Sequence, residues 1–225
     1  MHIIAGKKQI MQNEKIEFND IFSFFELINS VCKYIVLRNF EDFPEILTTS
    51  EHPDIDILCE NAKQVASKLS LENSQNYNDY VHYHIAINGK DIDVDLREIG
   101  DGYYDSTWEK KILNNRVFSN KGFYVPDDTD YFYSLLYHAL IQKKKLSDDY
   151  RQRLGVMARN VNVGLISVGY DNLNEFIRQN GYKYTYPKNP GTTFELKNVD
   201  PDLVEKNLSK KFARTCHKIK RKLRR

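Results

Sequence analysis

The first half of the chain alternates between helical and extended patterns of apolar residues. Apolar positions recur every three to four residues over 20–31 and over 62–69, which predicts two helices. The apolar run at 34–37 predicts a buried strand, and alternating aspartate and apolar residues over 54–58 predict a half-buried one. Prolines and polar residues between these strands predict a loop over 39–53.

Alternating segments on either side of Asn88-Gly89 predict a β-hairpin. This dipeptide favours a two-residue turn, so residues whose numbers sum to 177 should face each other across the two strands. One face of the hairpin is then apolar and should be buried, and it carries Tyr83, Ile85, Val94 and Leu96. A shift of one residue would exchange the two faces, so the turn also determines which side chains meet on the polar face.

The polar face of the hairpin pairs His82 with Asp95 and His84 with Asp93. Two histidine–aspartate pairs on a solvated sheet contribute little to stability, and this is the simplest interpretation. Two imidazoles and one carboxylate could instead bind a single metal ion. The neighbouring strand supplies more carboxylates and favours a site built from oxygen ligands.

Asp54 and Asp56 lie two residues apart on the predicted strand, so both side chains point to the same face. Like charges on one face repel unless a cation or a basic group lies between them. A solvated strand face explains the pair in isolation. If this strand lies beside the hairpin, however, Asp54 and Asp56 join Asp93 and Asp95 in a site of the kind that magnesium prefers.

The second half of the chain carries mainly helical patterns. Four helices are predicted, over 105–114, 128–143, 147–159 and 171–180, with Asp128, Ser147 and Asp171 as N-caps of the last three. The aromatic and proline-rich segment 182–199 predicts a surface loop that could cover a site. The fold class is therefore α+β, with a mixed sheet and flanking helices over 1–125, a helical region over 126–205 and a basic tail helix over 206–225.

The order of these motifs resembles the nucleotidyltransferase fold of the polymerase-beta type. The resemblance rests on the first strand with Arg38-Asn39 at its end, on Asp54-Ile-Asp56, and on Ile92-Asp-Val-Asp95-Leu-Arg97, and it covers roughly residues 20–125. The chain is also similar to nucleotidyltransferase domains of bacterial surface-polysaccharide pathways and, more distantly, to LicD-like phosphotransferases. The Gly-Ser turn that the family places after its first strand is replaced here by Leu37-Arg38-Asn39.

The resemblance implies a magnesium-dependent transferase. Asp54, Asp56 and Asp95 would be the catalytic metal ligands, with Asp93 as the rival third carboxylate. Contacts to the phosphates of an NTP-type nucleotide donor would come from Arg38, Asn39 and Arg97. The acceptor would be a small hydroxyl compound or a lipid-linked intermediate of cell-surface polysaccharide synthesis.

Two other functions stay open at this stage. Without the Gly-Ser turn, the same fold could bind a nucleotide or a protein as a regulatory module without turnover. An RNA-directed enzyme is a weaker alternative. Lys143-Lys144-Lys145 is either a solvated helix end or a phosphate contact, and His138 is either a buried core histidine or a catalytic group.

Charge is distributed unevenly along the chain. Residues 206–225 hold ten Lys and Arg and no Asp or Glu, which leaves 23 basic against 31 acidic residues over 1–205, a net charge of −8. An acidic body disfavours nucleic acid as a partner. The tail carries an apolar stripe at helical spacing, composed of Leu208, Phe212, Cys216, Ile219 and Leu223. It is predicted to bind an anionic membrane surface, to dock its stripe on the acidic body or, as a weaker alternative, to bind nucleic acid.

The cysteines and the N-terminus bear on the compartment. Cys32, Cys59 and Cys216 are far apart and odd in number, which disfavours a disulfide framework and indicates a reducing compartment. Residues 1–15 hold no apolar run of signal-peptide length. The sequence predicts a cytoplasmic protein that could lie peripherally on the inner face of the membrane.

Overall fold

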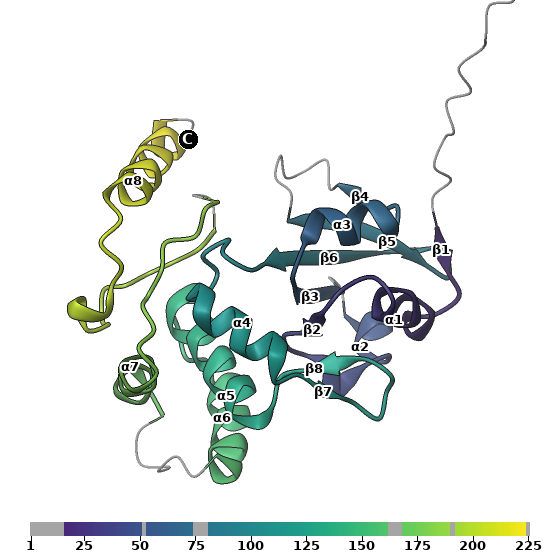
Figure 1. Cartoon of the computed structure of the whole chain (residues 1–225), viewed down its shortest axis with the longest axis horizontal. Helices are drawn as coiled ribbons and strands as arrows, with labels where there is room; N and C mark the ends of the chain where they lie inside the picture. Colours follow the sequence, from purple (N-terminus) through teal and green to yellow (C-terminus); the bar gives the residue numbers. More distant parts are fainter. Residues whose placement is uncertain (1–15, 51–52, 74–80, 162–167, 190–191, 224–225) are drawn as a thin grey trace, which may run out of the picture.

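The computed structural model describes residues 16–50, 53–73, 81–161, 168–189 and 192–223. The chain is a mixed α/β protein, in which one sheet lies beside a group of helices (Figure 1). The strands are β1 (Glu17–Phe18), β2 (Tyr34–Val36), β3 (Asp54–Cys59), β4 (Glu72–Asn73), β5 (His82–Ile87), β6 (Lys90–Glu98), β7 (Val117–Phe118) and β8 (Tyr124–Val125). The helices of four or more residues are α1 (Ile21–Asn29), α2 (Ile46–Thr49), α3 (Ala62–Lys68), α4 (Ser106–Asn114), α5 (Asp128–Tyr137), η2 (His138–Gln142), α6 (Asp148–Asn160), α7 (Tyr170–Gln179) and α8 (Leu208–Leu223).

The main sheet has the strand order β1-β5-β6-β3-β2, and β4 also pairs with β5. Strand β3 is parallel to β6 and antiparallel to β2. The predicted hairpin is confirmed, because β5 and β6 pair in the register that the Asn88-Gly89 turn requires. Tyr83, Ile85 and Val94 are all buried, as that register predicts.

Several expected element boundaries need correction. The segment 39–53 is not only a loop, because it contains the short helices η1 (Phe40–Asp42) and α2. Helix α5 is capped by Asp127 and not by Asp128, since the Asp127 side chain accepts from the Asp130 N–H. Helix α7 begins after Gly169, so Asp171 lies inside its first turn. Ser147 caps α6 as predicted.

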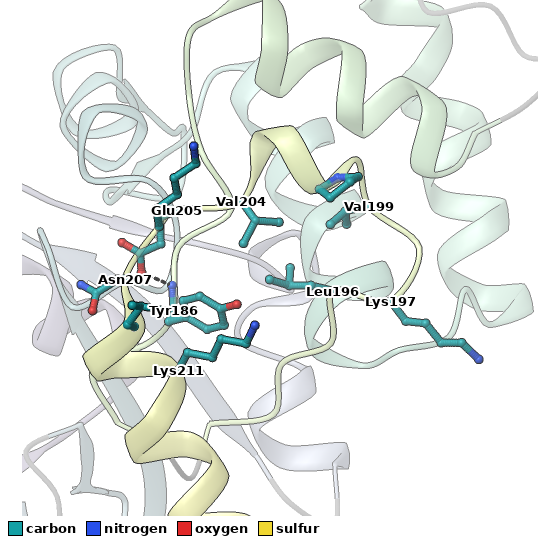
Figure 2. A pocket seen from close by; sticks show the side chains of 11 residues that line it. Tyr186, Leu196, Lys197, Val199, Val204, Glu205, Asn207 and Lys211 are labelled. Atoms are coloured by element: carbon teal, nitrogen blue, oxygen red, sulfur yellow. Dashed lines mark hydrogen bonds between the residues drawn. The ribbon is translucent and has the colours of Figure 1, made fainter.

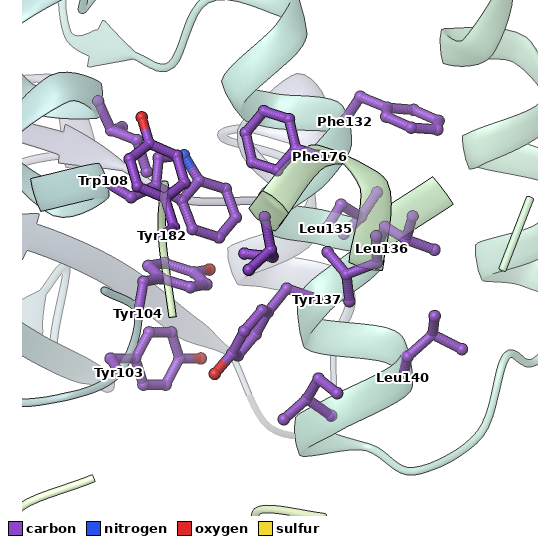
Figure 3. Packing of buried hydrophobic residues seen from close by; sticks show 14 of the residues in the cluster. Tyr103, Tyr104, Trp108, Phe132, Leu135, Leu136, Tyr137, Leu140, Phe176 and Tyr182 are labelled. Carbon is purple, nitrogen blue, oxygen red and sulfur yellow. The ribbon is translucent and has the colours of Figure 1, made fainter. Parts of the chain in front are cut away.

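The two faces of the sheet are covered differently. Alternate residues of β2, β3, β5 and β6 form one buried cluster with the apolar faces of α1 and α3. On the other face, Ile35, Leu37 and Leu58 enter a second buried cluster with helices α4 to α7. Figure 3 shows the aromatic centre of that cluster, where Trp108 and Tyr137 lie among other rings. The second face is therefore apolar at β2 and at Leu58 of β3, and it carries the charged residues at Asp54 and Asp56 of β3 and on β5 and β6.

The cluster that contains α5 to α7 also contains Trp108 and Ile112, which precede residue 125, so the boundaries at 125 and 205 stay predictions. Helix α8 lies at the periphery of the molecule, away from the sheet (Figure 1, yellow). Within the described residues, no helix combines the length and the apolar composition needed to cross a bilayer.

Candidate active site

Two rows of polar side chains cross the face of the sheet that α1 and α3 leave uncovered. Read across β3, β6 and β5, the rows are Asp54, Asp93 and His84, and Asp56, Asp95 and His82. The rows form because β3 and β6 are parallel neighbours, which brings both pairs of aspartates into register. The expectation that the carboxylates of β3 lie beside those of the hairpin is therefore confirmed.

Asp54, Asp56 and Asp95 lie close enough for their negative charges to repel one another. Burial, followed by the charge of Asp56, raises the pKa of Asp54 to about 6, and Asp95 adds to the effect. Burial and the charge of Asp56 also raise the pKa of Asp95. The positive charges of Arg38 and Lys143 act on Asp54 in the opposite direction. A bound cation would relieve the repulsion that is left among the three aspartates.

The structure separates the two candidates for the third carboxylate. Asp93 is 60% exposed in its side chain and lies 2.7 Å from the Nδ1 of His84. Asp95 is 24% exposed, lies beside Asp56 in the ladder and contacts the Nε2 of His82 at 3.6 Å. Asp95 therefore belongs to the crowded group, whereas Asp93 lies at its solvated edge.

Arg38 lies directly behind the carboxylates. Its guanidinium is buried and forms a short ion pair with the Oδ1 of Asp56, which is itself buried. Asn39, the residue after it, adopts a left-handed backbone with φ of 60° and accepts a hydrogen bond of 3.1 Å from Arg153. The stretch that replaces the Gly-Ser turn thus binds the chain's own side chains.

Arg97 is placed differently from Arg38. Its Nη2 lies 3.7 Å from Asp95 and its Nη1 lies 3.9 Å from Asp101, and both distances exceed a hydrogen bond. The guanidinium lies 4.5 Å from the ring centroid of Tyr103. Among the described residues, the Nε of Arg97 is one of the few buried polar atoms without a hydrogen-bond partner. Arg97 therefore holds donor capacity that the chain does not use.

A pocket of about 330 Å³ opens beside Arg97. Lys63, Glu98, Asp101 and Lys188 contribute charged side chains to its lining, and Pro187 and Asn189 bring the 182–199 loop to its wall. The loop is held there because the Lys188 N–H donates to the Asp101 carbonyl at 2.7 Å. The loop that was expected to cover a site therefore lies against the pocket beside Arg97.

The loop also fixes the backbone at Gly102. Gly102 has φ of 79°, and a Cβ at this position would lie 2.5 Å from the Tyr186 carbonyl oxygen. Only glycine combines that backbone with so close an approach. The same turn brings the Tyr103 ring under Arg97. Tyr103 is not among the site residues predicted from the sequence, because its contact with Arg97 depends on how the chain folds after β6.

A buried polar network lies behind Tyr103. The Tyr103 hydroxyl is 3.4 Å from the Nδ1 of His138, and that nitrogen is 2.7 Å from the Oε1 of Gln142. Burial, followed by the charge of Arg38, lowers the pKa of His138 well below its usual value, so the ring is neutral. His138 and Gln142 are the two ends of η2, a π-helical turn that continues α5. These contacts favour a supporting role for His138 over a catalytic one.

The three carboxylates offer the oxygen ligands that magnesium prefers. Asp54, Asp56 and Asp95 present only oxygen ligands, and the raised pKa values of Asp54 and Asp95 indicate negative charge without full compensation. Asp56 has its Oδ1 bound to Arg38, which leaves Oδ2 for an ion. As the side chains lie, no group of three or more His, Cys, Asp or Glu among the described residues has the geometry of a metal site. Ion binding would therefore require small rotations of these carboxylates.

No protein-family model matches this chain, and neither a curated protein nor a solved structure gives a significant match.

Proposed function

We propose that the chain is a magnesium-dependent transferase with a nucleotidyltransferase-like site. It would move a nucleotidyl or related phosphoryl group from an NTP-type donor to a hydroxyl acceptor. The observation that carries the proposal is the in-register placement of Asp54 and Asp56 beside Asp95 on neighbouring parallel strands. Carboxylates that converge from two strands, with arginines beside them, suit the charge that develops during phosphoryl transfer.

Each side chain of the site has a distinct role in this proposal. Asp54, Asp56 and Asp95 would hold magnesium, which would neutralise charge at the transferring phosphate. Asp95 would also accept the proton of the attacking hydroxyl. Arg38 holds Asp56 in place. Arg97 binds phosphate oxygens through the nitrogens that the chain leaves without close partners.

The pocket beside Arg97 is the proposed acceptor site. Its lining includes the carboxylates of Glu98 and Asp101 and the ammonium groups of Lys63 and Lys188, which can bind the hydroxyls of a sugar or polyol. This chemistry supports a role in the assembly of cell-surface polysaccharide.

One observation favours the alternative of a regulatory module that binds nucleotide or protein without turnover. The Nη2 of Arg38 already donates to Asp56, so the segment in place of the Gly-Ser turn has one fewer free donor for a triphosphate. Nucleotide binding in magnesium without release of pyrophosphate or phosphate would identify this alternative.

The test is turnover of an NTP in magnesium, with mixed sugars and polyols as acceptors. Asp95→Asn should reduce the rate at least a hundredfold, since it removes a metal ligand and the proton acceptor. Asp93→Asn is the matched control, because it changes the same residue type on the same strand face two positions away, and it should retain most of the rate. Equal losses in both variants, or no turnover in the wild type, would contradict the proposal.

A further inference from the structure

Helix α8 is attached to the rest of the chain through one side. Arg214 is buried, and its Nη2 donates to the Thr192 carbonyl at 2.7 Å and its Nη1 to the Asn189 carbonyl at 3.4 Å. Its guanidinium also lies 5.1 Å from the ring centroid of Phe194. These contacts fix which side of the helix faces the body of the protein.

The large apolar residues of α8 lie on the other side. At about 100° per residue, Leu208, Phe212 and Ile219 are displaced by about 120 to 160° from Arg214 around the helix axis. Their exposed fractions are 81% for Leu208, 70% for Phe212 and 52% for Ile219. Leu208, Phe212 and Ile219 therefore point to solvent, and the expected alternative in which the stripe docks on the acidic body is not the arrangement that these three residues show.

A second apolar surface adjoins the start of this stripe. A pocket of about 690 Å³ lies between the chain before α8 and the first turn of the helix (Figure 2). Its wall includes Leu196, Val199 and Val204, and Leu208 and Lys211 of α8 complete it. Its carboxylate, Glu205, is neutralised by Lys210 at 3.1 Å and accepts the Tyr186 N–H at 2.5 Å. The stripe thus continues into an apolar pocket with a lysine at its edge.

The charge around this surface identifies the class of partner. The segment from 206 to 225 holds ten basic residues and no acidic one. An apolar ridge with basic residues around it is typical of a helix that lies in the plane of an anionic bilayer. A nucleic acid would use the charge but would leave the exposed phenylalanine, leucine and isoleucine in water.

We propose that α8 docks on an anionic phospholipid surface, with Leu208, Phe212 and Ile219 inserted at the level of the headgroups. The contacts of Arg214 hold the body above the bilayer. This partner goes beyond the proposed transfer reaction, and it does not depend on that reaction.

The experiment uses the full chain and a fluorescent reporter, Phe212→Trp. The only tryptophan, Trp108, is fully buried, so its emission should not respond to vesicles. Vesicles of phosphatidylcholine and phosphatidylglycerol in a two-to-one ratio should shift the new emission to the blue at low salt. High salt should reverse the shift, and pure phosphatidylcholine should produce none. Val156→Trp, at a 61% exposed apolar position on α6, should show no shift.

Co-sedimentation with the same vesicles tests the stripe itself. Phe212→Ser with Ile219→Ser should lower the partition coefficient about tenfold or more, with every basic residue kept. The matched control, Phe118→Ser with Val156→Ser, removes two exposed apolar residues elsewhere and should partition as the wild type does. Circular dichroism of both variants checks that they fold.

Four results would overturn the proposal. They are no binding to anionic vesicles at low salt, equal binding to neutral vesicles, unchanged partition of the Phe212→Ser and Ile219→Ser variant, and self-association of the wild type that this variant abolishes. The last result would identify the stripe as an interface between copies of the chain. Because no readout depends on NTP turnover, failure here is distinct from failure of the proposed function.

Discussion

Among the described residues, the carboxylates of α4 and α5 and the carboxylates of the sheet face differ in their partners. On helix α4, Glu109 is fully buried and accepts the N–H groups of Gly100 at 2.6 Å and Tyr104 at 3.0 Å. Asp130 is also buried and accepts the Trp108 indole N–H at 2.9 Å. Both residues connect segments of the fold through donors that the chain itself supplies.

On the sheet face, carboxylates face other carboxylates. Asp54 and Asp95 lie beside Asp56, and only Asp56 has an arginine in close contact. The comparison shows that burial and a raised pKa do not by themselves identify a functional acid, since Glu109 has a pKa raised to about 8, chiefly by burial. What separates the two groups is that Glu109 and Asp130 each accept from an N–H group of the chain, whereas Asp54 and Asp95 face another carboxylate.

The largest effect on stability is expected for substitution of Glu109 on α4. Glu109→Ala leaves the Gly100 and Tyr104 N–H groups without an acceptor, which should lower the free energy of unfolding by about 3 to 5 kcal/mol. Urea denaturation measures the loss. Glu26→Ala, on the exposed side of α1, is the control and should change stability by less than about 0.5 kcal/mol. Equal stability of both variants would show that the hydrogen bonds of Glu109 do not stabilise the fold.

Asp56 shares a feature with each group, because it lies among the sheet-face carboxylates and also pairs with a side chain of the protein, Arg38. Asp56→Asn removes the charge opposite the buried Arg38 and should destabilise the protein by about 2 kcal/mol, in addition to lowering activity. Adding Arg38→Met should restore part of that stability, because it removes the cation left without a partner. A double variant as unstable as the sum of the two single variants would show that the ion pair is not coupled.

A smaller effect is expected for Arg97, and it should appear in catalysis. Arg97→Lys retains the charge but loses the planar array of donors, so kcat/KM should fall about tenfold, or about 1.4 kcal/mol, with little change in unfolding. Arg153→Lys is the comparison, since that arginine binds Asn39 and Tyr131 within the fold. A Tm loss of several degrees in Arg97→Lys would place Arg97 with the structural groups.

The smallest effect is expected for Asp54 in the absence of metal. Its folded pKa of about 6 lies above the unfolded value of 3.8, so its contribution to stability is present below 3.8 and is lost as the pH rises through 6. Asp54→Asn should therefore be slightly more stable than the wild type at neutral pH and equal to it at pH 3. Solvent at this exposed position keeps the gain below about 1 kcal/mol. Thermal unfolding across this pH range, with chelator present, checks the sign.

The sequence predicts which residues share the polar face of the sheet, but it does not predict the contacts of Arg38 and Glu109. The Asn88-Gly89 turn determines the hairpin register, and the two-residue spacing of Asp54 and Asp56 places both on one face. The ion pair of Arg38 could not be predicted, because it depends on the left-handed backbone at Asn39, where the chain leaves β2. Glu109 resembles a solvated helix residue in sequence, and its acceptor role depends on how the turn after β6 folds back.

The central claim is that Asp54, Asp56 and Asp95 together bind a divalent cation. Manganese titration followed by electron paramagnetic resonance measures this directly in the wild type and in the Asp54→Asn, Asp95→Asn and Asp93→Asn variants. We expect saturable binding in the wild type, nearly equal binding in Asp93→Asn, and at least tenfold weaker binding in Asp54→Asn and Asp95→Asn. Absence of binding in the wild type, or equal loss in Asp93→Asn and Asp95→Asn, would contradict the account.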